Sequence, residues 1–156
     1  MLVAVALAGC GGSSSTSSPG VSGSRSAAPA SPVRLSVATV RGLGTVLVNG
    51  EGRTLYVFEP DRRRHVTCLA GCAAVWPPVM ASSTQPTVTG PLEASLLGSD
   101  ADPVGGRVVT YDGWPLYLYH EDSGPGTANG QAEDLNGGLW YVISPSGRVI
   151  TTNPAA

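Results

Sequence analysis

The chain has 156 residues, a formal net charge of −2 and 13% charged residues. Proteins that bind nucleic acids carry clustered basic surface, so this composition argues against a nucleic-acid partner. The length fits one domain. After the first thirty or so residues, about 120 remain, which is enough to bury a core without help from a metal.

The N-terminal residues have the features of a lipoprotein signal. Residues 1–8 are almost wholly apolar and run into the sequence LAGC at residues 7–10. This tetrapeptide resembles a lipobox, in which the Cys receives a diacylglycerol thioether before cleavage. The apolar stretch is shorter than the roughly 20 residues that span a bilayer, but it has the length of a signal-peptide core. We expect residues 1–9 to be a lipoprotein signal peptide and Cys10 to be lipidated. Because no Lys or Arg precedes the apolar run, we expect the true start codon to lie upstream.

The segment after Cys10 predicts a tether. Residues 11–33 consist mainly of Ser, Gly, Pro and Ala, with a single charge at Arg25. Such a segment cannot bury enough apolar area to offset its chain entropy. We therefore expect residues 10–33 to be a lipidated Cys and a disordered linker, which holds a domain on the outer face of the cell membrane. The alternative is a chance Cys in a cytosolic protein, and it leaves the linker unexplained.

Beyond the linker, short runs rich in Val, Leu, Tyr and Thr alternate with Gly, Asn, Asp and Pro turns, a pattern typical of strands. We expect a mainly β domain over residues 34–153, a small antiparallel sandwich or barrel-like fold built from two repeated hairpin units, with one short helix near 70–76. The expected strands are residues 34–40, 45–48, 54–59, 107–111, 115–120, 139–144 and 148–151.

Two segments repeat one another. The sequence RTLYVFEPD at residues 53–61 matches WPLYLYHED at residues 114–122. Each copy follows a β run and a Gly turn, so the repeated unit is a hairpin. Alternate residues of a strand point to opposite faces, and both faces are apolar in both copies. We expect these strands to be covered on both sides, with their aromatic faces packed together across a sandwich or small barrel.

Each copy ends in an aspartate, Asp61 or Asp122, just past the predicted strand. A carboxylate at this place ordinarily accepts hydrogen bonds from turn N–H groups. The alternative is that the Tyr hydroxyls and these carboxylates converge on a ligand or an ion.

These residues resemble a family of predicted bacterial lipoproteins with the motif Tyr-x-[Phe/Trp/Tyr]-x-x-Asp, a secreted repeat of unknown function. The sequence CLAGCAAVWPP at residues 68–78 and LWYVISP at residues 139–145 match two further segments of that family. The resemblance covers about residues 43–147, with copies near 43–80 and 105–147, and implies location and domain type but no activity. The motif positions are Tyr56, Phe58, Asp61, Tyr117, Tyr119 and Asp122. The loop at residues 125–131 lacks the family's acidic residue, so we expect no carboxylate role there.

Cys68 and Cys72 form an even pair once Cys10 is lipidated, and a disulfide is the expected state in an oxidising compartment. Four-residue spacing on a helix or turn brings the two Cα atoms to about 6 Å, which a disulfide permits. The alternatives are a redox-active dithiol, or a soft-metal or haem site with His65 and Met80. No paired metal-ligand or Cys-x-x-Cys spacing accompanies the pair, so we expect no metal and no cofactor.

The remaining polar residues give no catalytic pattern. His120 stands beside Glu121, but adjacent strand residues diverge and no nucleophile motif accompanies them, so we expect no enzyme. The basic run at residues 62–64 favours a solvated loop, with contact to anionic lipid as the alternative. Trp76 precedes two prolines, which end the short helix, and we expect it to cover the sheet. We expect the same of Trp114 and Trp140.

The sequence thus favours a lipid-anchored envelope domain with a non-enzymatic binding or structural role. Its partner would be another envelope protein, a wall polymer or a small ligand, and the oligomeric state is left open. The rival hypothesis is a redox-active or metal- or haem-handling lipoprotein that uses Cys68 and Cys72.

Overall fold

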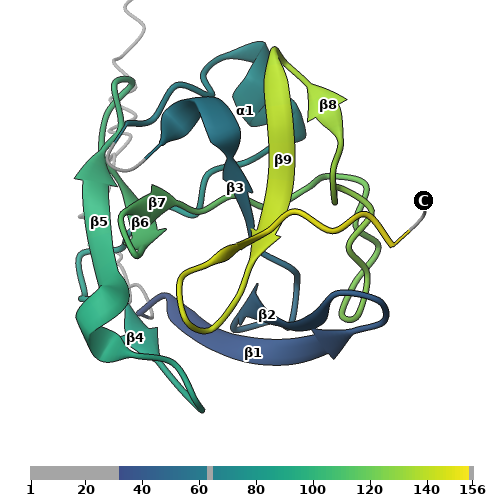
Figure 1. Ribbon diagram of the computed structural model, residues 1–156. Helices are drawn as coiled ribbons and strands as arrows, with labels where there is room; N and C mark the ends of the chain where they lie inside the picture. Colours follow the sequence, from purple (N-terminus) through teal and green to yellow (C-terminus); the bar gives the residue numbers. More distant parts are fainter. Residues whose placement is uncertain (1–31, 63–64, 155–156) are drawn as a thin grey trace, which may run out of the picture.

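The computed structural model describes residues 32–62 and 65–154 (Figure 1). The expected signal peptide, Cys10 and the linker up to residue 31 lie outside these residues. Val33, placed in the linker by the sequence, already accepts a backbone hydrogen bond from Thr87 at 2.8 Å. Within the described ranges the protein has ten strands and one short α-helix, so the prediction of a mainly β domain is confirmed.

The first hairpin consists of β1 (Arg34–Val40) and β2 (Gly44–Asn49), which pair antiparallel. The chain reverses through Gly42 and Gly44, whose φ values of +81° and +78° favour glycine. The short strand β4 (Thr87–Val88) runs parallel to β1 and completes a sheet in the order β2-β1-β4. Val46 and Val48 on one face of β2 and Leu47 on the other pack into the two apolar clusters of the domain.

The second hairpin consists of β5 (Leu97–Ala101) and β6 (Arg107–Tyr111), followed by β7 (Trp114–Pro115) in a sheet of order β5-β6-β7. A two-residue turn at Asp112 and Gly113 joins β6 to β7, and both residues have positive φ, as tight hairpin turns require. The sequence did not predict β5.

The longest strand of the third sheet is β9 (Gly138–Ile143), which lies between β3 (Tyr56–Phe58) and β10 (Val149–Ile150) (Figure 1). The two-residue strand β8 (Asp134–Leu135) pairs with the start of β9. The predicted strand at residues 54–59 is shorter in the structure because a 3-10 turn, η1 (Glu59–Asp61), begins at Glu59, with a proline at its start. A second 3-10 turn, η2 (Ala94–Leu96), leads into β5.

The two motif strands lie edge to edge, which corrects the prediction that their aromatic faces pack across a sandwich. Tyr117 forms isolated bridges with Tyr56 on one side and with Pro78 on the other. The expected strand at residues 115–120 is therefore reduced to β7 and this single bridged position. As a result, the aromatic side chains of both copies face one core.

Two apolar clusters lie on opposite faces of these strands. One contains Tyr56, Phe58, Tyr117 and Tyr119, and the other contains the intervening residues Leu55, Val57 and Leu116. The prediction that both faces are covered is confirmed. Burying each of these large apolar side chains stabilises the fold by about 1.5–3 kcal/mol. Three sheets around two clusters, with no closed barrel among the described strands, make the fold sandwich-like.

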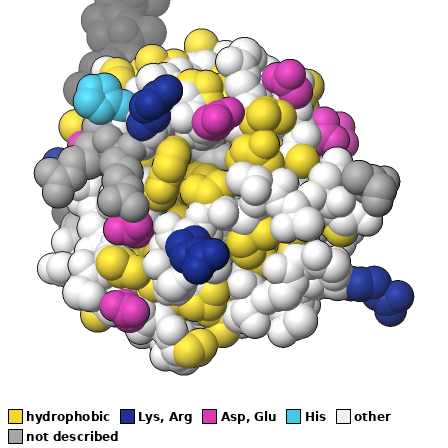
Figure 2. All heavy atoms as spheres, viewed as in Figure 1, with side chains coloured by type: hydrophobic (Ala, Val, Ile, Leu, Met, Phe, Trp, Pro, Cys, Tyr) yellow, Lys and Arg dark blue, Asp and Glu magenta, His cyan; other side chains and the backbone are white. Residues whose placement is uncertain are grey.

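The one described helix, α1 (Gly71–Val75), lies within the range predicted from the sequence. None of the helices in the described ranges is long and apolar enough to cross a membrane. On the face shown in Figure 2, charged side chains are scattered between several separate apolar patches.

Candidate functional site

The two motif copies meet at their tyrosines. Tyr56 and Tyr117 exchange both backbone hydrogen bonds, N–H to carbonyl, each 2.9 Å long. This reciprocal pairing relates the copies by an approximate two-fold axis that passes between the two residues. Both side chains are fully buried. All six motif residues predicted from the sequence lie within the region around this axis.

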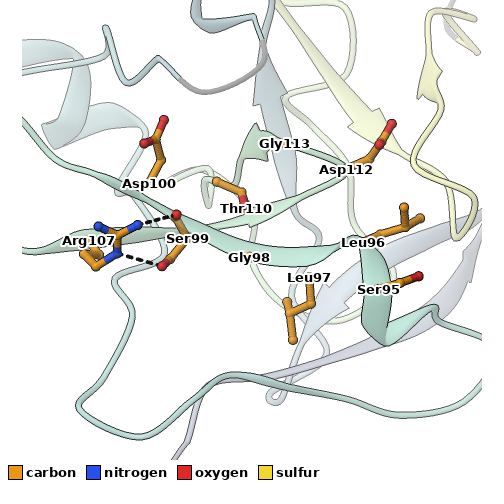
Figure 3. Close-up of a pocket in the computed structure, with 10 residues that line it drawn as sticks. All are labelled: Ser95, Leu96, Leu97, Gly98, Ser99, Asp100, Arg107, Thr110, Asp112 and Gly113. Atoms are coloured by element: carbon orange, nitrogen blue, oxygen red, sulfur yellow. Dashed lines mark hydrogen bonds between the residues drawn. The ribbon is translucent and has the colours of Figure 1, made fainter.

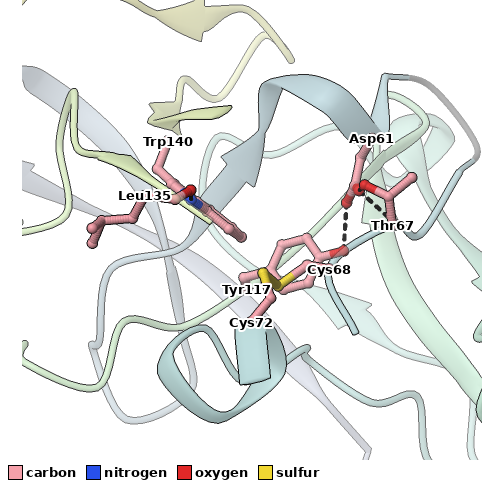
Figure 4. The surroundings of a disulfide bond; sticks show 7 residues. All are labelled: Asp61, Thr67, Cys68, Cys72, Tyr117, Leu135 and Trp140. Atoms are coloured by element: carbon pink, nitrogen blue, oxygen red, sulfur yellow. Dashed lines mark hydrogen bonds between the residues drawn. A yellow bond between two sulfur atoms is a disulfide. The ribbon is translucent and has the colours of Figure 1, made fainter. Parts of the chain in front are cut away.

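The tyrosine of each copy pairs with the aspartate of the other copy. The Tyr56 hydroxyl donates to Asp122 Oδ2 at 2.8 Å. The Tyr117 hydroxyl donates to Asp61 Oδ2 (Figure 4). We call these two contacts the crossed pairs. They satisfy buried polar groups that neither copy satisfies by itself.

The second oxygen of Asp61 is taken by its own repeat. Oδ1 accepts hydrogen bonds from the Thr67 backbone N–H at 2.7 Å and from the Thr67 hydroxyl at 2.6 Å (Figure 4). Asp61 is completely buried, with an exposed fraction of 0%. Asp61 therefore accepts a hydrogen bond from a turn N–H, as expected, and also one from the Tyr117 hydroxyl. Both of its carboxylate oxygens are bonded to groups of the protein itself.

Asp122 is held in the equivalent way by the loop at residues 125–131. Its Oδ1 accepts a hydrogen bond from the Asn129 backbone N–H at 2.9 Å. The next N–H, that of Gly130, donates to the Tyr56 hydroxyl at 3.3 Å. The loop thus closes the crossed pair with main-chain groups, which explains how it performs this role without an acidic residue.

Burial sets the protonation of these groups. Desolvation raises the pKa of Asp61 and of Asp122 above the ordinary value, although hydrogen bonds from Thr67 and Asn129 act in the opposite direction. Burial also raises the pKa of Tyr56 and Tyr117 far above the usual range, and the neighbouring carboxyl adds to the effect. The two hydroxyls therefore remain protonated donors at every physiological pH.

A stack of four aromatic rings continues the crossed arrangement. Trp76 and Trp140 lie at its centre with ring centroids 3.9 Å apart and planes at 1°. Phe58 stacks on Trp140 at 4.2 Å, and Tyr119 stacks on Trp76 at 4.1 Å. Each tryptophan thus covers the aromatic residue of the other copy, and each is fully buried, as the sequence predicted. Trp114, which was also expected to cover the sheet, is only partly buried. It packs against the other apolar cluster, the one that contains Leu55 and Leu116.

The two tryptophans differ in their indole N–H groups. Trp140 Nε1 donates to the Leu135 carbonyl at 3.1 Å (Figure 4). Trp76 Nε1 is buried and has no partner among the described residues. The residues before Trp76 form α1, whereas those before Trp140 form the β8–β9 turn, so only the second repeat presents a carbonyl to the indole.

Cys68 and Cys72 form a disulfide with Cα atoms 5.2 Å apart, in agreement with the prediction (Figure 4). Cys68 is buried at the edge of the aromatic cluster, and the bridge fixes the turn that leads into α1 and Trp76. Both sulfurs are occupied by this bond. In the described ranges no three His, Cys, Asp or Glu side chains gather as a metal site would require.

The other expected site residues do not join this centre. His65 is exposed, and Met80 is 41% exposed. His120 Nε2 lies 3.7 Å from Glu121 Oε1 on the surface, because the two residues occupy a turn. The expectation that they diverge was therefore wrong. An exposed pair of this kind contributes little to stability.

The sequence did not single out the residues that complete the site. Thr67, Asn129 and Gly130 supply the donors described above. Gln131 fastens the C-terminal segment, since its Nε2 donates to the Ile150 carbonyl at 2.7 Å and its Oε1 accepts from Val142 N–H at 2.8 Å. Asn129, Gly130 and Gln131 lie in the loop at residues 125–131, and its resemblance to a family loop was the feature of the sequence that could have pointed to them. Its hydrogen-bond partners are set by the tertiary structure.

The architecture defines a class of protein: a disulfide-bridged, mainly β domain in which two tandem repeats share one aromatic centre. The family described as a secreted repeat of unknown function matches residues 37–80 and 98–144, and the chain belongs to it. The two matches begin within β1 and β5, so each includes most of one hairpin. A search of curated proteins and a search of solved structures found no match.

Proposed function

We propose that this protein is a lipid-anchored domain on the outer face of the cell membrane with a non-enzymatic binding or structural role. The observation that carries the non-enzymatic role is the crossed pairs. The polar side chains of the repeated motif are buried and bonded to one another, and the tyrosines stay protonated. A general acid or base must reach a substrate proton, and this centre has no such access.

Three observations support the proposed location. The sequence LAGC places Cys10 after an apolar stretch, as in a lipobox. The family is described as secreted. The Cys68–Cys72 disulfide fits an oxidising compartment outside the cytoplasm. Several acyl chains on one Cys would hold the protein firmly, because each buried methylene contributes about 0.8 kcal/mol.

Cell fractionation of the Cys10→Ala variant tests the anchor. The native protein is expected in the membrane fraction, and the variant is expected in the soluble fraction or as an unprocessed precursor. Globomycin, which inhibits the lipoprotein signal peptidase, should cause a larger precursor to accumulate. The matched control is the double variant Cys68→Ala/Cys72→Ala, which should stay with the membrane. Membrane association that is unchanged by Cys10→Ala would contradict the anchor.

A thiol titration separates this proposal from a redox or metal-handling role. We expect no reactive thiol at residues 68 and 72 in native or denatured protein before reduction, and no new absorption band on adding haem, copper or zinc. A dithiol that cycles at a mild reduction potential, or a tight band with one of these additions, would replace the binding or structural role by the rival hypothesis.

A further inference from the structure

The second hairpin carries an open groove that lies apart from the crossed pairs. It runs along β5 and β6 and has a volume of about 560 Å³ (Figure 3). Small-molecule sites ordinarily fall in the range of about 300–1,000 Å³. The groove is lined mainly by polar and small residues, among them Ser95, Gly98, Asp100, Thr110 and Asp112.

Thr110 supplies a polar group without a partner in the floor of this groove. Its exposed fraction is 5%, and it lines the groove in Figure 3. Among the described residues, no group forms a hydrogen bond with its hydroxyl. Trp76 Nε1 is the one buried side-chain atom left without a partner in the described ranges, so the Thr110 hydroxyl still opens onto the groove. Such a hydroxyl is available to a ligand.

Gly98 keeps that hydroxyl accessible. It lies directly opposite Thr110 in the β5–β6 pairing. A Cβ atom at this position would lie 2.9 Å from Thr110 Oγ1, closer than real contacts allow. The φ value of Gly98 lies outside the left-handed region, so the backbone does not demand glycine. Glycine inside a strand often marks a place where a ligand approaches closely.

At the corresponding position the first hairpin carries a buried valine. Its corresponding pair is Ser36 and Val48, since Val48 bridges to Thr54 as Thr110 pairs with Pro115. Val48 is 2% exposed and belongs to the aromatic cluster. The combination of a bare glycine and an unpartnered hydroxyl thus occurs in one repeat only, and the shared fold does not require it.

The charges around the groove restrict its ligand. Asp100 and Asp112 stand at opposite ends with Thr110 between them (Figure 3). Two carboxylates disfavour an anionic polymer. The cation among the described residues that line the groove is Arg107, which donates to the Ser99 hydroxyl at 2.8 Å and to the Ser99 carbonyl at 2.6 Å. Because the guanidinium holds this carbonyl at the edge of β5, strand addition by a peptide is obstructed.

We propose that this groove binds a neutral saccharide chain. Sugar hydroxyls both donate and accept, so one ligand satisfies the Thr110 hydroxyl and a carboxylate oxygen of Asp100 together. Because Gly98 has no side chain, a sugar ring can approach the sheet closely at this position. This inference rests on the proposed binding role and names the class of its ligand, and a saccharide is accessible to a domain outside the cytoplasm.

Titration of the purified full-length Cys10→Ala protein with neutral oligosaccharides tests the proposal by NMR. The probes are a β-1,4-linked N-acetylglucosamine tetramer and maltotetraose, with spermidine as a cationic comparison. With at least one oligosaccharide, we expect saturable shifts of backbone amides confined to β5, β6 and η2. If both oligosaccharides leave these amides unmoved, or if spermidine alone shifts them, the saccharide proposal is overturned.

Two variants sharpen the test. Thr110→Val is expected to weaken oligosaccharide binding roughly three- to tenfold while leaving the free energy of unfolding unchanged or higher. Gly98→Ala is expected to abolish binding by covering the hydroxyl. Thr45→Val, at an exposed position of β2, is the matched control and should bind normally. If Thr110→Val binds like the native chain, or if it destabilises the fold, the hydroxyl has no role in binding and the proposal fails.

Failure of this proposal is distinguishable from failure of the proposed function. Membrane association depends on Cys10 and should be unaffected by Thr110→Val in cells. A protein that stays anchored but ignores saccharides leaves the proposed function in place. A protein that binds saccharides without being anchored leaves the groove in place and overturns the location.

Discussion

The two hairpins share a backbone plan but differ in what covers one face. In the first, Val48 packs into the aromatic cluster. In the second, Thr110 takes the same place in the pairing and borders an open groove. The shared motif residues, by contrast, meet around one axis, where their side chains form hydrogen bonds and ring contacts between the two repeats. The duplicated features therefore hold the domain together, and its specific role is to be sought in the features that are not duplicated.

The crossed pairs also explain why the repeats occur together. In a single repeat, Asp61 would lose the Tyr117 hydroxyl and Tyr56 would lose its acceptor. Each buried polar group without a partner costs about 1–3 kcal/mol. One copy would also expose its half of the ring stack. The second repeat is thus the binding partner that the first requires.

The largest effect is expected from breaking the ring stack. Trp76→Ala and Trp140→Ala should each lower the free energy of unfolding by about 3–5 kcal/mol, because each removes a fully buried ring from the centre of the domain. Trp114→Ala, at a partly buried position outside the stack, should cost clearly less. Urea unfolding measures all three. Equal losses at all three positions would show that the stack has no special role.

A smaller effect is expected from breaking one crossed pair. Tyr56→Phe and Tyr117→Phe should each cost about 1–3 kcal/mol, since each leaves a buried carboxyl oxygen without its donor. The loss for Tyr56→Phe should be the larger of the two, because the Gly130 N–H also loses its acceptor. Tyr141→Phe, at a partly buried position of β9, is the control and should change stability little. A cost at one tyrosine alone would show that the two halves are not equivalent.

The smallest effect is a pH dependence. Burial raises the pKa of Asp122 in the folded state, so the stabilising contribution of this group is complete below its ordinary pKa and is lost as pH rises through the raised value. Asp122→Asn does not titrate. The stability advantage of the native protein over this variant should therefore shrink as the pH rises above the ordinary carboxyl pKa of about 4. Asp134→Asn in the exposed strand β8 is the control. An advantage that grows with pH would contradict the raised pKa.

The sequence predicts the local features of this fold well. The strands at residues 34–40 and 107–111 have the predicted bounds, because β-branched residues and glycine turns define them locally. The strand β5 escaped prediction because Gly98 and Asp100 have low strand propensity. That same glycine marks the groove, so the position at which sequence reasoning failed is a candidate site.

The pairing of the motif residues could not be predicted. Tyr and Asp were recognised as a set, but Tyr56 and Asp122 are 66 residues apart, and no local pattern says which tyrosine meets which aspartate. The choice depends on the register between β3 and the bridged position at Tyr117, which is set by packing on both faces. The backbone donors of Asn129 and Gly130 were missed for the same reason.

A double-mutant cycle tests most directly whether each repeat completes the other. The cycle of Tyr56→Phe with Asp122→Asn should show a coupling energy of about 0.5–3 kcal/mol, because the two side chains are in direct contact. The cycle of Tyr56→Phe with Asp61→Asn, both within one motif copy, should be additive to within about 0.5 kcal/mol. Coupling within the copy, together with additivity between the copies, would contradict the crossed arrangement.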